Sequence, residues 1–226
     1  MADRFLNHFT TYAFTPAFWA AAPPERDRVL ADLAAAVPTL AEAAWAYSVF
    51  PVRPECDLLI WCAVRVENAD SPADFLTAYA ARMAPFRAWL QPTAALWGFT
   101  RPSQYHPGKS PQLLDPFDPV RRRYLVIYPF SKTNDWYQLG PEARQGMMNE
   151  HIRVGKEYPD ITQLLLYCTG LADQEFVVVY ETAELPLFSE LVVALRSTDG
   201  RPYTLRDTPI TTAIWRPLHE LVAQWR

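Results

Sequence analysis

The chain has 226 residues, half of them hydrophobic and a fifth charged, with a formal net charge of −4. This is a globular composition that excludes disordered chains, and the length provides for one large domain or two small ones. The longest basic run, Arg121–Arg123, is too short for a nucleic-acid surface, and no stretch approaches the roughly 20 apolar residues that cross a bilayer. The amino terminus lacks a signal-peptide pattern, and three cysteines beside apolar runs indicate reduced thiols. We therefore expect a cytoplasmic protein without membrane insertion.

The first hundred residues show the order strand, helix, strand, strand, helix, strand. Proline at the start of the first long helix, at Pro23, suits a helix amino terminus. The clearest elements are a strand over 9–14, a helix from Pro23, a strand over 57–64, a helix over 75–82 and a strand over 95–99.

The second half repeats this order. Its elements are a strand over 124–128, a helix over 141–156, a strand over 173–180, a helix over 188–196, a strand over 210–215 and a terminal helix over 217–226. The pairs Phe18/Trp136 and Arg26/Arg144 are each separated by 118 positions, which indicates a duplication. Each half has the ferredoxin-like order. We therefore predict an α+β fold, a dimeric α+β barrel made of two ferredoxin-like repeats.

The repeats are expected over 1–100 and 121–226. Between them, residues 101–120 form a proline-rich connecting loop without helical or strand periodicity. A loop of this length in a compact domain is usually functional or mobile. Whether it gates a pocket is left open by the sequence.

His151 lies on the predicted helix over 141–156, on the same face as Met147 and Met148. A neutral imidazole on an apolar helix face is a suitable axial ligand for haem iron, although a lone histidine there is more often packed in the core. The counterpart of His151 in the first half, 118 positions earlier, is Leu33. This exchange of leucine for histidine indicates that the two copies diverged for a site.

Several motifs of the second half resemble the chlorite dismutase and coproheme decarboxylase family. They are Tyr128–Lys132, Asp135–Tyr137, Asn149–His151, Gly170–Leu171 and Asp173–Phe176. The resemblance is specific over about residues 123–215, and the first half matches only in the order of its elements. It implies homopentamers of double ferredoxin-like subunits, with haem held in the carboxy-terminal half.

The resemblance also implies a role for each matching residue. His151 is the iron ligand, Lys132 binds a propionate, and Trp136 contacts the macrocycle. Asp199 stands where the family has an acidic acceptor for the histidine ring, although the family residue is usually the longer Glu. Chlorite dismutases carry a distal arginine where this chain has Gln163, and a neutral amide holds an anion far less well.

Gln163 and Tyr128 together resemble one branch of the coproheme decarboxylases. The implied reaction is peroxide-dependent conversion of coproheme III to haem b in haem biosynthesis, with Tyr128 as the redox-active phenol and hydrogen peroxide as the second partner. This branch has an upstream basic residue that holds a propionate, whereas the chain reads Gln112 to Pro116 there. Arg101 and the Arg121–Arg123 run are possible substitutes.

Three alternatives stay open. The chain could be a haem b protein with peroxidase or chlorite-degrading activity, a non-catalytic haem-binding relative, or a relative that has lost its cofactor and packs His151 in its core. The resemblance leaves unresolved whether coproheme or haem b is the bound species.

Overall fold

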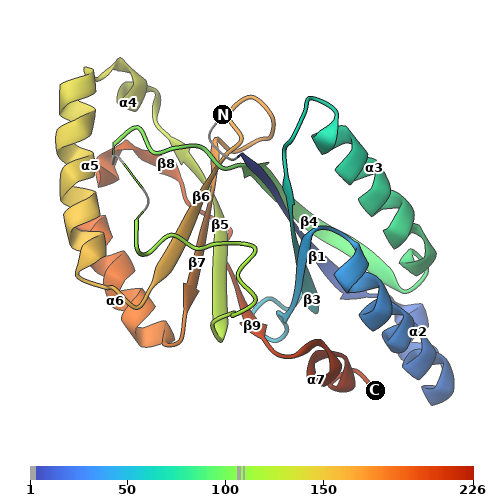
Figure 1. Ribbon diagram of the computed structural model, residues 1–226. Coiled ribbons are helices and arrows are strands. Elements are labelled where there is room, and N and C mark those ends of the chain that lie inside the picture. Colours follow the sequence, from blue (N-terminus) through green and yellow to red (C-terminus); the bar gives the residue numbers. More distant parts are fainter. Residues whose placement is uncertain (1–3, 106–107, 109) are drawn as a thin grey trace.

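The computed structural model describes residues 4–105, 108 and 110–226 of the chain (Figure 1). In this part, the strands have the bounds β1 Phe5–Phe14, β2 Ala43–Ser48, β3 Leu58–Arg65, β4 Leu90–Phe99, β5 Tyr124–Lys132, β6 Thr162–Tyr167, β7 Phe176–Thr182, β8 Thr204–Arg206 and β9 Thr211–Trp215. The α-helices are α1 Pro16–Ala20, α2 Pro23–Ala36, α3 Ser71–Met83, α4 Asn134–Gln138, α5 Pro141–Lys156, α6 Leu185–Arg196 and α7 Leu218–Ala223.

Each half of the molecule forms an antiparallel sheet with the same strand order. The first half is ordered β4-β1-β3-β2, and the second β9-β5-β7-β6. Numbered within each half, both orders are 4-1-3-2. The predicted strand–helix–strand–strand–helix–strand order is therefore confirmed in both halves, and the fold is α+β with ferredoxin-like halves.

The two sheets meet along both of their edges, so the pairings close into a ring of strands. One junction joins β4 to β6 at Phe99 and Tyr167, and the other joins β2 to β9. At the first junction Gly98 allows the close approach, since a Cβ there would lie 2.9 Å from the carbonyl oxygen of Tyr167.

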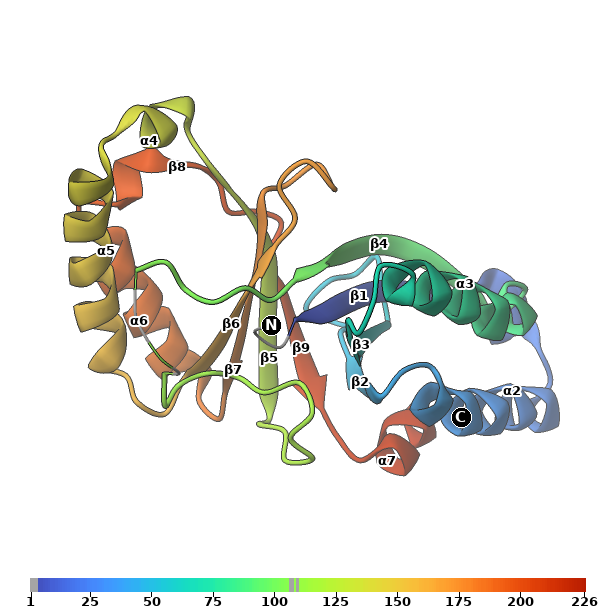
Figure 2. The same ribbon diagram turned by 45° about the horizontal axis from the view of Figure 1, so that its top comes forward.

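The helices cover the outer faces of the two sheets, α2 and α3 on the first half and α5 and α6 on the second (Figure 2). Alternation along the strands sends one set of apolar side chains between the sheets and the other set toward the helices. Leu125, Ile127, Leu164 and Val179 belong to the core between the sheets. The interface between β1, β3 and the helices α2 and α3 is a separate core that includes Leu30 and Leu33.

Both long helices that follow the first strand of a half begin where the sequence predicts. Pro23 and Pro141 are their first residues, and a short helical turn precedes each, with Phe18 in one turn and Trp136 in the other, both buried. This confirms the 118-residue correspondence in the structure. Glu142 in the first turn of α5 and Lys156 in its last turn suit the helix dipole.

The connecting loop is tied to the second half by specific hydrogen bonds. The main chain of Gln163 on β6 donates to Gln112 at 2.8 Å and accepts from Leu114 at 2.9 Å. The Gln112 side-chain amide donates to the carbonyl oxygens of Gly155 and Tyr158 at the end of α5. The loop therefore runs along the edge of β6 and against the carboxyl end of α5. No helix in the described part of the chain is long and apolar enough to cross a membrane.

Candidate active site

Helix α5 packs far less tightly on its sheet than its counterpart α2. In α2, Val29, Leu30 and Leu33 are buried, whereas Val154 is the single buried residue of α5 among those described. On the sheet beneath, the side chain of Leu165 of β6 points to the face that α5 covers, and yet it stays 41% exposed. The space between α5 and the sheet is therefore not filled by side chains of this chain.

The strand register shows which side chains line this space. On β6 and β7, Gln163 lies opposite Tyr180, Leu165 opposite Val178 and Tyr167 opposite Phe176. On β5, Tyr128 lies opposite Val178 and Phe130 opposite Phe176. Opposed residues of antiparallel strands point to the same face, and the neighbouring residues of each strand point into the core between the sheets. The face toward α5 is thus largely aromatic and aliphatic, with Gln163 and the phenols as its polar groups.

His151 projects from α5 into this region and is partly buried. Burial, and next the positive charge of Lys132, lower the pKa of His151 to about 4, so that the ring is neutral at pH 7. A neutral imidazole has a free nitrogen lone pair, which is what iron requires from a histidine ligand. The charge effect also places Lys132 close to His151, as their sequence spacing predicts for a shared site.

Lys132 ends strand β5 with its ammonium group over aromatic rings. Nζ lies 4.1 Å from the ring centroid of Trp136 and 5.3 Å from that of Phe130. Burial, and next the charge of Arg201, lower the pKa of Lys132 to about 8. Among the described residues no carboxylate forms an ion pair with this ammonium. The nearest acidic influence is Glu175, which accepts from the Lys132 backbone N–H at 2.7 Å and whose charge offsets part of the lowering of the Lys132 pKa.

Tyr128 lies in the middle of β5, beside Tyr180. Their ring centroids are 6.3 Å apart, and the two hydroxyl groups interact by hydrogen bonding. Burial, next the neighbouring Tyr180 and then the charge of Asp207 raise the pKa of Tyr128 well above its usual value, so that the phenol is protonated at neutral pH. Asp207 is itself held by Arg201 at 2.5 Å and Arg196 at 3.5 Å.

Two other residues predicted from the sequence differ in how they meet this site. The exposed Gln163 points to the same face as Tyr128. Gln163 pairs with Tyr180 of β7, whereas Tyr128 pairs with Val178, two residues earlier on the same strand. Asp199 reaches α5 through its backbone, since its N–H donates to Glu150 Oε2 at 2.8 Å while its own side chain is exposed. The carboxylate whose charge acts on the His151 ring is that of Glu150. A contact between the Asp199 side chain and His151 stays a prediction.

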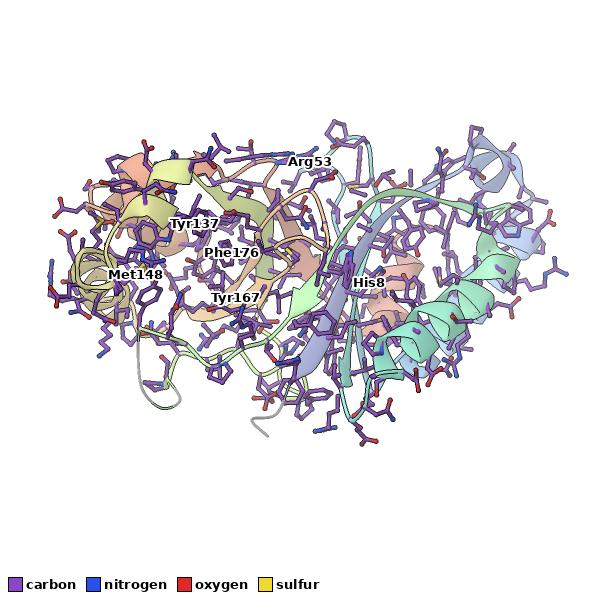
Figure 3. All side chains as sticks on the ribbon, turned by 90° about the horizontal axis from the view of Figure 1, so that it is seen from above. His8, Arg53, Tyr137, Met148, Tyr167 and Phe176 are labelled. Carbon is purple, nitrogen blue, oxygen red and sulfur yellow. The ribbon has the colours of Figure 1, made fainter. Side chains whose placement is uncertain are left out.

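Several residues at the site had no role assigned to them from the sequence, although Tyr137 and Phe176 lie within the family motifs and Met148 lies on the helix face of His151. Seen from above, Tyr137, Met148, Tyr167 and Phe176 surround the space between α5 and the sheet (Figure 3). Arg144 lies seven residues before His151 and hence on the same helix face, a spacing that sequence alone could have revealed. Tyr180 and Arg201 come close only through tertiary folding, and nothing in the local sequence marks them.

The residues present fit an iron porphyrin. A large flat macrocycle requires an unfilled apolar face, an axial ligand and cations for its carboxylates. The structure offers the uncovered sheet face, the neutral imidazole of His151 and the half-buried ammonium of Lys132, which forms no ion pair among the described residues. In the described chain no cluster of three or more histidine, cysteine, aspartate or glutamate side chains could hold a bare metal ion. A groove of about 530 Å³ lies elsewhere, along α6 between Tyr158 and Val193.

Residues 26–216 match the family model for chlorite dismutase. The chain belongs to the chlorite dismutase family. Members of this family include haem-dependent chlorite dismutases and coproheme decarboxylases, both of which are enzymes. The fold and the matching motifs of the second half agree with this assignment.

Individual members show the same division. The chain is 29% identical over 180 residues to a coproheme decarboxylase of Mycolicibacterium smegmatis, covering 79% of this chain and 75% of that one. It is 24% identical over 222 residues to a chlorite dismutase of Ideonella dechloratans, covering 95% and 77%. The structure of a single-substitution mutant of chlorite dismutase from Candidatus Nitrospira defluvii superposes with a TM-score of 0.83 at 22% identity, covering 100% of this chain and 96% of that one. This structural similarity shows the fold, the family model shows the family, and the reaction is left to be inferred from the site.

Proposed function

We propose that this protein binds coproheme III through His151 and decarboxylates it to haem b with hydrogen peroxide. The observation that carries the proposal is the grouping on one side of a single sheet: a protonated phenol, Tyr128, and a half-buried ammonium, Lys132, beside a neutral histidine. The similarity to a coproheme decarboxylase of Mycolicibacterium smegmatis, at 29% identity, supports the proposal.

The reaction removes one carboxylate at a time. Each propionate loses carbon dioxide, two electrons and one proton from its β carbon and becomes a vinyl group. One peroxide takes up the two electrons, that proton and one further proton from solvent, and gives two waters. When bound, the iron porphyrin would supply the redox chemistry that reduces peroxide. The protein's part is to orient the propionate, to pass a hydrogen atom, and to exclude other reactions.

Tyr128 is suited to pass the hydrogen atom. A phenol is protonated at neutral pH, and burial and Tyr180 raise the pKa of Tyr128 further, so its oxidation releases the proton together with an electron. The hydroxyl of Tyr180, in contact with that of Tyr128, gives the departing proton a neighbour within the protein. A phenol that can lose and regain a hydrogen atom in place can serve two successive decarboxylations.

Lys132 is suited to hold the reacting propionate. Its ammonium lies against Trp136 and forms no ion pair among the described residues, so a carboxylate would gain a charge-assisted hydrogen bond there. Such a carboxylate would also raise the pKa of Lys132 back toward its ordinary value. Lys132 and Tyr128 lie four residues apart on β5, at the same face, which brings the held group and the phenol to one side of the site.

Chlorite degradation is a less suitable reaction for this face. Gln163 is neutral, and the family resemblance implies that it stands where chlorite dismutases have arginine, so it would provide no charge for an anionic substrate. Oxygen release from chlorite by the haem-loaded protein at rates comparable to peroxide-driven decarboxylation would restore the dismutase alternative.

The test is to titrate the purified chain with ferric coproheme III, add hydrogen peroxide stepwise, and follow the porphyrin by mass spectrometry. We expect two successive losses of carbon dioxide with the accompanying hydrogen, giving haem b. Tyr128→Phe should abolish both losses with little change in the Soret band. Tyr124→Phe, on the same strand, is the matched control and should leave them intact. Persistence of all four carboxylates in the parent protein would refute the proposal.

The iron ligand is tested separately. His151→Ala should change the haem absorption spectrum and weaken binding, whereas His219→Ala, at an exposed position on α7, should do neither. An unchanged spectrum for His151→Ala would show that the histidine is only packed there. Sedimentation of the loaded protein would check the homopentamer implied by the family resemblance, and cell fractionation its cytoplasmic location.

A further inference from the structure

Arg144 on α5 has a buried nitrogen that lacks an acceptor. Its Nε has no hydrogen-bond partner among the described residues. Arg26 and Arg121 also have such an atom, but their guanidinium groups donate elsewhere to main-chain carbonyls. The Arg144 guanidinium forms no hydrogen bond or ion pair within the described part of the chain. A buried cationic donor without an acceptor is unfavourable, so this position lacks its partner in the protein alone.

Three elements converge on Arg144. Its neighbour on α5, Gln145, donates to the carbonyl oxygen of Tyr105 at 3.1 Å and so fixes the connecting loop against the helix. The charge of Arg144 acts on the phenols of Tyr105 and Tyr137, which places both near its guanidinium. Tyr137 borders the space between α5 and the sheet (Figure 3). The site therefore has a polar corner formed by α4, α5 and the loop.

The other candidate arginines are engaged differently. Arg121 is buried between the two sheets, 3.4 Å from Glu181 and over the rings of Trp45 and Trp61. It cannot face the space beneath α5. Arg101 rests on the ring of Tyr167, with its guanidinium carbon 4.9 Å from the centroid. Among these three arginines, and within the described residues, Arg144 alone combines a buried donor atom with a guanidinium that makes no hydrogen bond or ion pair.

We propose that Arg144 binds a porphyrin carboxylate at the loop side of the site, with the hydroxyl of Tyr105 as a further donor. The hydroxyl of Tyr137 is engaged by the Glu175 carboxylate and borders this subsite without serving it. This subsite rests on the proposed function, since it takes the ligand to be a porphyrin that carries several carboxylates. It replaces the upstream basic residue that the sequence lacks. It also explains why the loop is fixed to α5 at Tyr105: a carboxylate there would hold helix and loop together.

The probe is metal-free coproporphyrin III, whose binding is followed by its fluorescence and by quenching of tryptophan fluorescence. Because it contains no iron, the measurement does not depend on the His151 bond or on peroxide. We expect Arg144→Gln to weaken binding by about tenfold to a hundredfold, the range for a hydrogen bond to a charged group. Arg144→Lys should recover part of the loss. Arg153→Gln, on the exposed face of the same helix, should bind as the parent does.

The tetramethyl ester of coproporphyrin III separates charge recognition from packing. The ester has no carboxylates, so the parent and Arg144→Gln should bind it equally. Parent-like binding of coproporphyrin by Arg144→Gln, or an equal loss for acid and ester, would overturn the subsite. So would failure of the parent to bind coproporphyrin. In each case the mass-spectrometric assay of Tyr128→Phe still decides the proposed function independently, and thermal unfolding of each variant confirms that it folds.

Discussion

The two halves of this molecule share a strand order and differ in what lies between helix and sheet. Leu33 of α2 and His151 of α5 each lie ten residues after the first proline of their helix. Leu33 is 1% exposed and packs in a continuous core with Phe75 and Tyr79 of α3. His151 faces a sheet whose side chains stay partly exposed. One duplicated framework has therefore produced a closed core and an open site.

The difference shows which part of the framework carries stability and which part is available for chemistry. In the second half α6 still packs on the sheet, with Leu191 buried against Val126 and Tyr180. Only α5 is held away, by its ties to the connecting loop and to the segment that contains Asp199. Sites often have less internal packing than the surrounding scaffold because a ligand completes them.

The junction between the halves gives the largest expected effect. Glu181 of β7 accepts from Tyr47 of β2 at 3.3 Å and pairs with buried Arg121 at 3.4 Å. Glu181→Ala leaves the guanidinium buried without its anion, and we expect a loss of about 3–5 kcal/mol in the free energy of unfolding. Urea unfolding measures this, and Glu190→Ala on the surface of α6 should change it little. Two separate transitions in the variant would show that the halves unfold independently.

Substitutions at the equivalent positions of α2 and α5 should give the next largest effect, and the two positions should differ from each other. Leu33→Ala opens a cavity in a packed core and should cost about 2–5 kcal/mol of unfolding free energy. His151→Ala removes a side chain from an unfilled space and should cost less than about 1 kcal/mol in the ligand-free chain. Denaturant titration of both variants checks this. Similar losses at the two positions would mean that α5 is as tightly packed as α2, which would contradict the open site.

The sequence predicted the framework better than the site because the two depend on different information. The signals for the framework lie in short stretches of sequence: the prolines at 23 and 141, and the alternation of apolar and polar residues in the strands. Both repeats and both long helices could therefore be placed. The strand over 9–14 is longer than expected, beginning at Phe5, because β1 pairs with β3 and β4 along its whole length. Likewise α3 begins at Ser71, four residues before the predicted start, at a Ser-Pro pair.

Within the site, the family motifs led to Tyr128, Lys132, Trp136 and His151, which the fold brings to one region. Arg144 and Tyr180 were missed for different reasons. The spacing of Arg144 from His151 on the helix could have been recognised in the sequence. Tyr180 becomes a neighbour of Tyr128 only through the pairing of β5 with β7, which no local pattern reveals.

A second buried histidine extends the comparison to pH. His8 of β1 lies in the closed half, between Phe75 and Tyr79, with Nδ1 3.3 Å from the hydroxyl of Thr10. Burial lowers the pKa of His8 from 6.5 to about 4. The unfolded chain therefore takes up a proton first as the pH falls, so stability declines between about pH 6.5 and pH 4 and is unaffected above. The shift corresponds to a loss of about 3 kcal/mol over that window.

Replacing His8 with leucine should remove this part of the pH dependence, which unfolding in urea at pH 7 and pH 4.5 would measure. His219→Leu, at an exposed position, should leave the decline as it is in the parent. His151 titrates in the same direction in the ligand-free chain, so part of the decline should survive in His8→Leu. Porphyrin is expected to bind in the second half, so the decline in stability that is due to His8 should persist when porphyrin is bound. Iron bound to His151 should suppress the decline that is due to His151. An identical pH profile for His8→Leu and the parent would show that the first-half core admits water, and the contrast between closed core and open site would then fail.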